Sequence, residues 1–287
     1  MKSKILLSHK NIEPENGVLY LVGTPIRNLS DISTRALHIL KNVSFVACED
    51  TRQTIKIMNK YAIKNSLVSF NEHNTSIKTP KIINDLKSGK SIALVSDAGM
   101  PGICDPGEEL VKNLKDLGFD VICIPGPCAA ITALVSSGLP SSKFIFEGFL
   151  PKKKIDREKI LVEISKNTKT TIIYESPHRL HKLLKELKKY CGGSKQIQIA
   201  RELTKKFEQQ IGSNVDEIIE FFENNKPKGE FTILIKGVEF SEKNSFNVLE
   251  LKEELHYLVK AGLSLSLASK YLAKKNNISK RTIYNLY

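Results

Sequence analysis

The sequence has few of the features that mark secreted, metal-binding and membrane proteins. Its five cysteines, at positions 48, 104, 123, 128 and 191, form no C-x-x-C pair and no Cys/His cluster with zinc spacing. An odd and scattered set suits a reducing compartment, where thiols act as small apolar side chains. The start, MKSKILLSHKN, has an apolar run of three residues, too short for a signal-peptide core. Since no run approaches the length of a membrane span, we expect a soluble, cytoplasmic protein without membrane association.

Two standard phosphate-binding motifs are also missing. The chain has no G-K-[ST] of a Walker A loop and no G-x-G-x-x-G of a dinucleotide site. Yet the stretch ALVSDAGMPGICDPG, residues 93–107, begins as an apolar run and then breaks into seven Asp, Gly and Pro residues. A plain turn needs one or two of these. The loop is therefore expected to bind something other than a nucleoside triphosphate or a dinucleotide.

The bulk composition indicates a globular and strongly basic protein. The chain has 287 residues, 41% of them hydrophobic, which suffices for a sizeable core in two domains or one large one. Its formal net charge is +13. A basic surface attracts phosphate-rich partners, chiefly nucleic acid or an anionic membrane face. Composition bias toward lysine is the alternative explanation, so charge alone does not decide for nucleic acid.

Apolar strand-like runs alternate with helical patterns along most of the chain. The runs at 17–22, 43–48, 67–70, 91–96 and 119–126 are nearly continuous in apolar residues, with helical patterns between them. This is typical of a mostly parallel sheet covered on both faces. After 124–140 the runs lie at 144–149, 170–175, 196–200, 207–212 and 229–237. We expect a second α/β domain there, with more antiparallel pairing.

The expected domains are 1–124, 125–238 and a small helical tail at 246–287. The two α/β domains join near 125–127, and the polar stretch 238–246 is typical of a linker. The tail predicts helices over 248–261, 264–276 and 279–286, resembling a helix-turn-helix, with Ser279 as the cap of the last helix.

Four polar loops follow strands of the first predicted sheet, at 23–31, 48–54, 70–74 and 93–107. The carboxyl ends of parallel strands meet at one edge, where open α/β sheets bind ligands. Helix capping is the alternative role for Asp50, for Ser30 or Asp31, and for Asp105. After Asp105, Pro106 suits the first position of a helix and Glu108 would complete a capping box. His73 has the alternative of being a plain surface histidine. Asp97 and Gly99 have no such local role, so we expect them to contact a ligand.

Eight motifs together resemble the ribosomal RNA small subunit methyltransferase I family, a tetrapyrrole-methylase-like (class III) group of S-adenosylmethionine enzymes. In order over about residues 17–237 they are GTPIRNLSDISTRAL, CEDTRQT, SFNEHN, SDAGMPGICDPG, IPGPCA, SGLPSSKFIFEGFLP, YESPHRL and ARELTKKFE. The resemblance is specific because all eight agree in order and spacing. The chain departs from the family pattern at Arg27, where Gly is usual, and at Cys104 and Cys128, where Ser is usual.

The resemblance implies two α/β domains of the tetrapyrrole-methylase type with S-adenosylmethionine in the cleft between them, plus the helical tail. It implies 2′-O-methylation of a cytidine ribose in the decoding region of small-subunit (16S) rRNA, with the ribosomal subunit as the partner. A homodimer is an expectation from the family. No metal site is predicted.

On this relation the loop at 97–101 should hold the cofactor through backbone groups, while a loop at 125–128 and a turn at 138–140 form the opposite wall. The expected cofactor-binding residues are Asp97, Ala98, Gly99, Met100, Pro101, Pro125, Gly126, Pro127, Cys128, Gly138, Leu139, Tyr174 and Ala200. Cysteine is a weaker hydrogen-bond partner than serine, which puts a side-chain contact from position 128 in question.

Methylating a ribose hydroxyl requires a group that accepts its proton. The candidates for this base are Asp50, Glu72, His73 and Glu175, of which His73 titrates nearest neutral pH. The expected RNA-binding residues are Arg27, Asn28, Arg52, Asn71, Arg179 and Arg201. Lysine and arginine outnumber Asp and Glu nine to two over 178–206 and seven to three over 152–169. An ordinary solvated helix face is the alternative for the lysines of 182–189.

Two other functions compete with this interpretation. A small-molecule methylase acting on a tetrapyrrole could share the fold, but such an enzyme has no need of the charge excess. A DNA-binding regulator could work through the basic tail, in which eight Lys and Arg face four Asp and Glu over 241–287. The tail could equally dock rRNA or pack as a dimer contact.

Overall fold

The computed structural model describes residues 13–238, 248–276 and 278–287. The chain forms two compact units, Met1–Gly237 and Val238–Tyr287, and each is described by itself. Most of the expected linker at 238–246, the first two residues of the expected tail and the N-terminal segment 1–11 lie outside the described residues. No helix within the described ranges combines the length and apolarity needed to span a bilayer.

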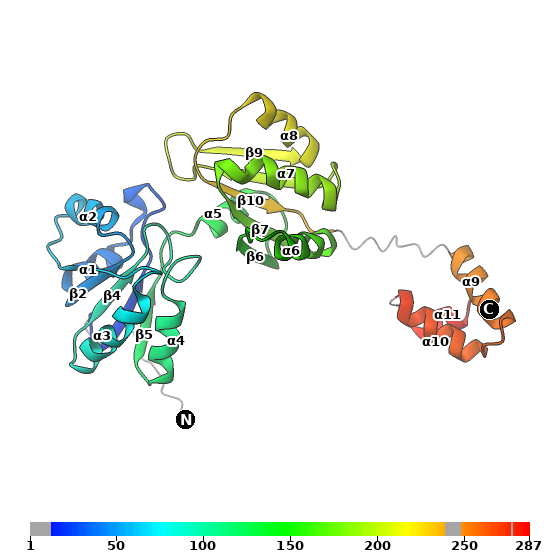
Figure 1. Ribbon diagram of the computed structural model, residues 1–287, viewed down its shortest axis with the longest axis horizontal. Helices are drawn as coiled ribbons and strands as arrows, with labels where there is room; N and C mark the ends of the chain where they lie inside the picture. The colour runs from blue at the N-terminus through cyan, green and yellow to red at the C-terminus, as the bar shows by residue number, and fades with distance from the viewer. Residues whose placement is uncertain (1–12, 239–247, 277) are drawn as a thin grey trace. The chain divides into compact units, whose positions relative to one another are not determined.

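The first unit begins with a five-stranded parallel sheet in the order β3-β2-β4-β1-β5 (Figure 1). Its strands are β1 (Val18–Val22), β2 (Phe45–Cys48), β3 (Leu67–Ser69), β4 (Ile92–Val95) and β5 (Asp120–Ile124). All are paired in parallel. The helices between them are α1 (Thr34–Asn42), α2 (Thr51–Lys60), α3 (Thr75–Lys87) and α4 (Glu108–Asp116). The predicted parallel sheet is confirmed.

Two separate apolar cores show that both faces of this sheet are covered. One core joins Ile39 of α1 and Ile57 of α2 to Val46 and Val95, which are almost fully buried. The other joins Leu86 of α3 and Leu114 of α4 to the opposite side chains of the same strands. Because neighbouring residues of a strand point to opposite faces, strands buried on both sides are apolar throughout, as the sequence is here.

The capping predictions are confirmed at one helix and wrong at two places. Asp50 caps α2, its carboxylate accepting from the Arg52 N–H at 2.8 Å. Ser30 and Asp31 cap nothing; they lie in the 3₁₀ helix η1 (Leu29–Asp31), and Ser33 caps α1. Asp105 does not cap α4 either. That helix starts three residues later, after Gly107 at φ 143°, a conformation in which the loop continues past Asp105 and Pro106.

The second half of this unit is a mixed sheet in the order β6-β7-β10-β8-β9. The strands are β6 (Phe144–Phe149), β7 (Thr170–Glu175), β8 (Gln196–Arg201), β9 (Gln209–Asn214) and β10 (Phe231–Ile235). Only β6 and β7 pair in parallel, so the predicted antiparallel character is confirmed. The helices are α5 (Ala129–Ser136), α6 (Lys154–Lys166), α7 (Pro177–Cys191) and α8 (Val215–Asn224). Buried leucines of α7 pack with α6, α8 and the sheet in one core.

The second unit contains the three predicted tail helices, α9 (Val248–Lys260), α10 (Leu265–Asn276) and α11 (Lys280–Tyr284). Leu255, Leu272 and Ile283 form the centre of a small core of their own. Ser279 caps α11 as predicted, its hydroxyl accepting from the Thr282 N–H at 3.0 Å. Tyr257 and Tyr271 are exposed on this unit.

Candidate functional site

The loops that follow β1, β4 and β5 are tied together at the edge of the first sheet. Thr24 and Gly99 exchange backbone hydrogen bonds at 2.8 and 3.1 Å. Gly23 and Gly126 touch, since a Cβ added to either would lie 2.6 Å from the other's Cα. No side chain fits between these backbones. The close approach of the two loops therefore requires glycine at both positions. It brings the loop after β1 against the loop after β5, where the two halves of this unit join.

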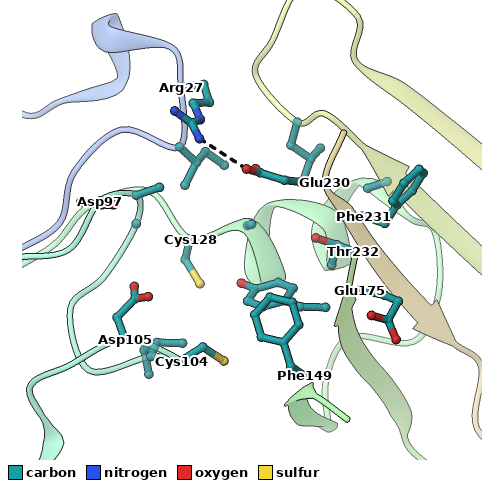
Figure 2. A pocket seen from close by; sticks show the side chains of 18 of the residues that line it. Arg27, Asp97, Cys104, Asp105, Cys128, Phe149, Glu175, Glu230, Phe231 and Thr232 are labelled. Carbon is teal, nitrogen blue, oxygen red and sulfur yellow. Dashed lines mark hydrogen bonds and ion pairs between the residues drawn. The ribbon is translucent and has the colours of Figure 1, made fainter. Parts of the chain in front are cut away.

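A cavity of about 450 Å³ opens where this joint meets the second sheet (Figure 2). Seven of the predicted cofactor residues line it: Asp97, Ala98, Gly99, Met100, Cys128, Tyr174 and Ala200. Six do not: Pro101, Pro125, Gly126, Pro127, Gly138 and Leu139. Leu139 instead packs in a buried apolar cluster with Ala200 and Leu134. We refer to this space as the first cavity.

The backbone of the predicted ligand loop is less free than expected. The Gly99 N–H and C=O are both bonded to Thr24, and the same carbonyl also accepts from the Ser96 hydroxyl at 3.4 Å. A ligand in the first cavity would therefore meet the side chains of this loop and the backbone of residues beside Gly99.

One wall of the first cavity is aromatic. The Tyr174 ring contacts Phe146 edge-on, with centroids 5.1 Å apart, and Phe149 at 5.6 Å. Its hydroxyl accepts from the Ala130 N–H at 2.9 Å, which ties β7 to α5. Burial raises the pKa of this phenol above its ordinary value, so it stays neutral. Flat apolar groups of this kind suit a flat aromatic ligand.

The opposite wall carries three carboxylates, Glu49, Asp97 and Asp105, which form no salt bridge with any described residue. Burial, followed by the charge of Glu49, raises the pKa of Asp105 to about 6. Burial and neighbouring carboxylates also raise the pKa of Glu49 and of Asp97. This wall carries negative charge without a counter-ion, which favours a positively charged or hydrogen-donating ligand.

A second cavity of about 410 Å³ lies at the ends of β2, β3 and β4. It is lined by Glu49, Asp50, Thr51, Arg52, Ser69, Asn71, Glu72, His73 and Asp97. Three predicted base candidates and two predicted RNA-binding residues are therefore brought together here. No group of three or more His, Cys, Asp or Glu side chains placed to hold a metal ion occurs among the described residues.

The fourth base candidate, Glu175, lines the first cavity but is held elsewhere. Its fully buried carboxylate lies 3.5 Å from Arg157 and 3.3 Å from Arg179. Arg179 also donates to the Leu150 carbonyl at 2.7 Å. Arg201 donates to the Lys228 carbonyl at 2.7 Å and to the Gln209 side chain. These two predicted RNA contacts thus have partners inside the protein.

Arg27 lies at the mouth of the first cavity, where its guanidinium is 3.4 Å from Glu230 of the second half (Figure 2). Next to it the Asn28 N–H donates to the Thr204 hydroxyl, which in turn donates to the Ile26 carbonyl, each at 3.3 Å. Arg27, Thr204 and Cys104 all have positive φ, 120°, 64° and 62°. Such strain in non-glycine residues is concentrated at functional sites, and two of these residues, Arg27 and Cys104, line the first cavity, whereas Ala62 and Glu202 have positive φ outside its lining.

Sequence reasoning missed several residues of the two cavities. Glu49, Phe149, Leu203, Glu230 and Thr232 line the first cavity but were not predicted to bind a ligand. Glu49 stands in the quoted motif CEDTRQT directly before Asp50, so the motif contained the signal. Nothing in a pattern tells which of two adjacent carboxylates faces a cavity and which caps a helix. Glu230 and Thr232 carried no signal, because they reach the cavity from the beginning of β10 and the residue before it, in the second half.

Comparisons with known proteins agree with this architecture. The family model of the tetrapyrrole (corrin/porphyrin) methylases matches residues 18–219. The ribosomal RNA small subunit methyltransferase I of Synechocystis sp. is 42% identical over 270 residues, 94% of this chain and 97% of that protein. The protein of the same name from Bacillus subtilis is 41% identical over 96% of each chain. That from Thermotoga maritima is 45% identical over 78% of this chain and 100% of its own length.

Solved structures support the fold at lower identity. A cobalt precorrin-4 methyltransferase is similar with a TM-score of 0.59 and 16% identity, covering 77% of this chain and 95% of that one. The uroporphyrin-III C-methyl transferase from Thermus thermophilus, complexed with S-adenyl homocysteine, gives 0.53 at 17% identity, covering 75% and 96%.

Proposed function

This chain belongs to the ribosomal RNA small subunit methyltransferase I family, and we propose that it methylates the 2′-hydroxyl of a cytidine in the decoding region of small-subunit (16S) rRNA. The family is one of S-adenosylmethionine-dependent methyltransferases, which makes S-adenosylmethionine the cofactor. The observation that carries the proposal is identity near 40% over almost the whole chain to relatives named for this RNA. The ribose position and the decoding region go beyond those names.

The first cavity fits this cofactor in both shape and charge. Its aromatic and apolar wall, with Tyr174, Ala200 and Leu203, suits a flat purine. Its carboxylate wall, with Asp97 and Asp105, suits a sulfonium or an ammonium group, since it lacks a cationic partner. We therefore assign the predicted residues 97–100, Cys128, Tyr174 and Ala200 to direct cofactor contact. Residues 125–127 and 138–139 would act behind that wall.

When bound, S-adenosylmethionine supplies a methyl carbon already activated by the adjacent sulfonium. The chain's own residues must then position a hydroxyl in line with that carbon and accept its proton. Asp50, Glu72 and His73 surround the second cavity, beside the first, and so remain candidates for holding the substrate or its proton. Glu175, clamped between two arginines, is better suited to shaping the cavity wall.

Cofactor affinity should fall as the pH is lowered through about 6. The pKa of Asp105 is raised to about 6, so its charged form, which attracts a cation, is lost below that pH. Between pH 7.5 and 5 we expect affinity for S-adenosylmethionine to drop about tenfold, by linkage to one proton. S-adenosylhomocysteine, which lacks the sulfonium charge, should show a smaller change. Titration calorimetry at several pH values measures both, and an identical pH dependence in Asp105→Asn would contradict the assignment.

The RNA-binding surface includes the exposed cations at the two cavities. Arg52 is 87% exposed and Arg27 is 49% exposed, while Asn28 and Asn71 lie beside them. Both arginines are paired with carboxylates, Asp50 and Glu230, from which an RNA phosphate would displace them. Arg179 and Arg201 would contribute to RNA binding indirectly, by fixing the backbone at Leu150 and Lys228, whose carbonyls they bind. The lysine-rich helices α6 and α7 add sequence-independent attraction.

The tail should strengthen RNA binding without affecting cofactor binding. The Thermotoga maritima relative matches over its whole length but covers 78% of this chain, so the family includes a shorter form. We expect deletion of residues 241–287 to weaken binding of small subunits on the order of tenfold, because the basic tail adds phosphate contacts. Calorimetry with S-adenosylhomocysteine should give an unchanged Kd. Unaltered subunit binding by the truncated chain would remove the tail from the RNA-binding surface.

The substrate class can be tested directly. Purified protein, labelled S-adenosylmethionine and small subunits from cells lacking the modification should yield labelled RNA. A tetrapyrrole offered in the same assay should remain unlabelled. Label on the tetrapyrrole and none on RNA would overturn the proposal. Assembled subunits as substrate, a homodimer and a cytoplasmic location belong to the same proposal and rest on the family resemblance.

A further inference from the structure

The two cavities share one wall, and two carboxylates form it. Glu49 and Asp97 are the residues that line both cavities. Their proximity follows from the sheet, because Cys48 of β2 lies opposite Val95 of β4 and each chain continues past its strand end. The Asp97 N–H donates to the Glu49 carboxylate at 3.5 Å, and the Asp50 N–H donates to that of Asp97 at 3.0 Å. A group in one cavity can therefore meet a group in the other across these two side chains.

The second cavity is suited to hydrogen-bond donors and not to phosphate. It holds four carboxylates, those of Glu49, Asp50, Glu72 and Asp97, and a single arginine. That arginine, Arg52, is already bonded to both oxygens of Asp50 at 2.8–3.1 Å. Within a protein of net charge +13, the inside of such an acidic hollow repels a phosphate, and Arg52, 87% exposed, can meet one only on the side facing solvent. The hollow attracts the N–H and O–H groups of a nucleoside.

Among the bases, those with an exocyclic amino group match this lining best. Carboxylates accept hydrogen bonds from the amino group of cytosine, while uracil offers none at that position. Ser69 and Asn71 add hydroxyl and amide groups to the same cavity. Enzymes that modify one nucleotide commonly turn it out of the RNA into such a pocket. A cytidine whose base lies among these groups would place its ribose toward the first cavity.

We propose that the second cavity holds the target nucleoside and that Glu49, in the shared wall, accepts the proton of its 2′-hydroxyl. The inference rests on the proposed function and names a substrate site and a catalytic residue for it. As the ribose oxygen bonds to the methyl carbon, the carbon–sulfur bond breaks and its electron pair stays on sulfur, giving a neutral thioether. The hydroxyl proton moves to the Glu49 carboxylate and later to water.

Glu49 is a better proton acceptor for this step than the neighbouring Asp50. Asp50 is bonded to Arg52, which lowers its pKa and makes it a weak base. Burial, then the charges of Asp97, Glu72 and Asp50, raise the pKa of Glu49 and make it a stronger one. The charge of Glu49 in turn raises the pKa of Asp105, which lines the first cavity.

The decisive variant is Glu49→Gln, which keeps the size of the side chain and removes its basicity. We expect kcat on small subunits to fall by about 10² to 10⁴-fold, the usual contribution of a general base. Calorimetric affinity for S-adenosylhomocysteine should change by less than about threefold, since this ligand lacks the sulfonium charge that a carboxylate would attract. The same substitution at Glu109, exposed on α4 outside both cavities, is the matched control and should leave both quantities unchanged.

Two further readouts separate a base from a structural residue. The rate of the wild-type protein should fall as the pH is lowered, with an apparent pKa above the ordinary range of a glutamate. The residual activity of Glu49→Gln should not show this fall. Saturation-transfer NMR of the S-adenosylhomocysteine complex should show contact with cytidine and much less with uridine. Glu72→Gln should weaken the cytidine signal but not cofactor binding.

The outcomes distinguish this inference from the proposed function. No methyl transfer to RNA by the wild-type protein overturns the proposed function. Normal transfer by wild type together with near-normal kcat in Glu49→Gln overturns only the assignment of the base. Loss of S-adenosylhomocysteine binding in Glu49→Gln also overturns it and makes Glu49 a cofactor residue. Equal signals from cytidine and uridine, unaffected by Glu72→Gln, overturn the nucleoside site.

Discussion

Gly126→Ala should nearly abolish cofactor binding and lower the free energy of unfolding by about 3 kcal/mol, the upper range for inserting a group into a packed site. The new Cβ would lie 2.6 Å from the Cα of Gly23 and 2.8 Å from its carbonyl carbon. Both contacts are with backbone, which cannot rotate away. The loops after β1 and β5 must therefore separate, and the Thr24–Gly99 pairing beside them positions the wall of the first cavity.

Chemical denaturation measures the stability change, and calorimetry with S-adenosylhomocysteine measures the binding. Gly212→Ala is the matched control, since its Cβ would meet only the end of the flexible Gln198 side chain on the neighbouring strand. We expect this control to keep wild-type binding and nearly wild-type stability. Wild-type affinity in Gly126→Ala would show that the contact of the two glycines does not shape the cofactor site.

Arg157→Met should lower the free energy of unfolding by about 3–5 kcal/mol, the usual cost of removing one partner of a buried ion pair. The Arg157 side chain is 2% exposed and lies between Glu186, at 2.7 Å, and Glu175, at 3.5 Å. Without it the fully buried Glu175 keeps Arg179 as its ion-pair partner. Methionine fills much of the volume, so lost charge pairing and not an empty cavity dominates the expected effect.

Lys182→Met is the matched control, because Lys182 pairs with Glu186, as Arg157 does. Lys182 lies 3.9 Å from Glu186 and is 64% exposed, so its loss should change stability by less than about 1 kcal/mol. The double variant Arg157→Met with Glu175→Gln should lose less than the sum of the two single variants, because the carboxylate that loses Arg157 as a partner is then uncharged. Equal losses in Arg157→Met and Lys182→Met would show that burial does not govern this network.

The fold could be predicted from sequence because its helices and strands have recognisable local sequence patterns. The runs at 144–149 and 170–175 became β6 and β7 with the predicted bounds, since short runs rich in β-branched and aromatic residues favour strands, whether buried like β7 or partly exposed like the edge strand β6. The loops after β1 to β4 were placed correctly at one edge, because parallel strands must end together. The last tail helix was predicted with its cap, Ser279.

The details of the site could not be predicted, because they depend on distant contacts. Asp105 has the local pattern of a helix cap, yet α4 starts after Gly107 and the carboxylate lines the first cavity instead. Glu175 was a candidate for the general base, but two arginines from α6 and α7 hold it. Arg27 could be recognised as unusual, whereas its pairing with Glu230 joins residues about two hundred positions apart. Local pattern carries no information on such pairs.

The measurement that tests the account most directly is the chemical position of the transferred methyl group. Small subunits lacking the modification are incubated with labelled S-adenosylmethionine and the protein, and the RNA is digested to nucleosides. The account predicts that the label is recovered as 2′-O-methylcytidine, from a single nucleotide of the decoding region that resists alkaline cleavage. Label recovered on a base, on another ribose, or on no RNA at all would contradict it.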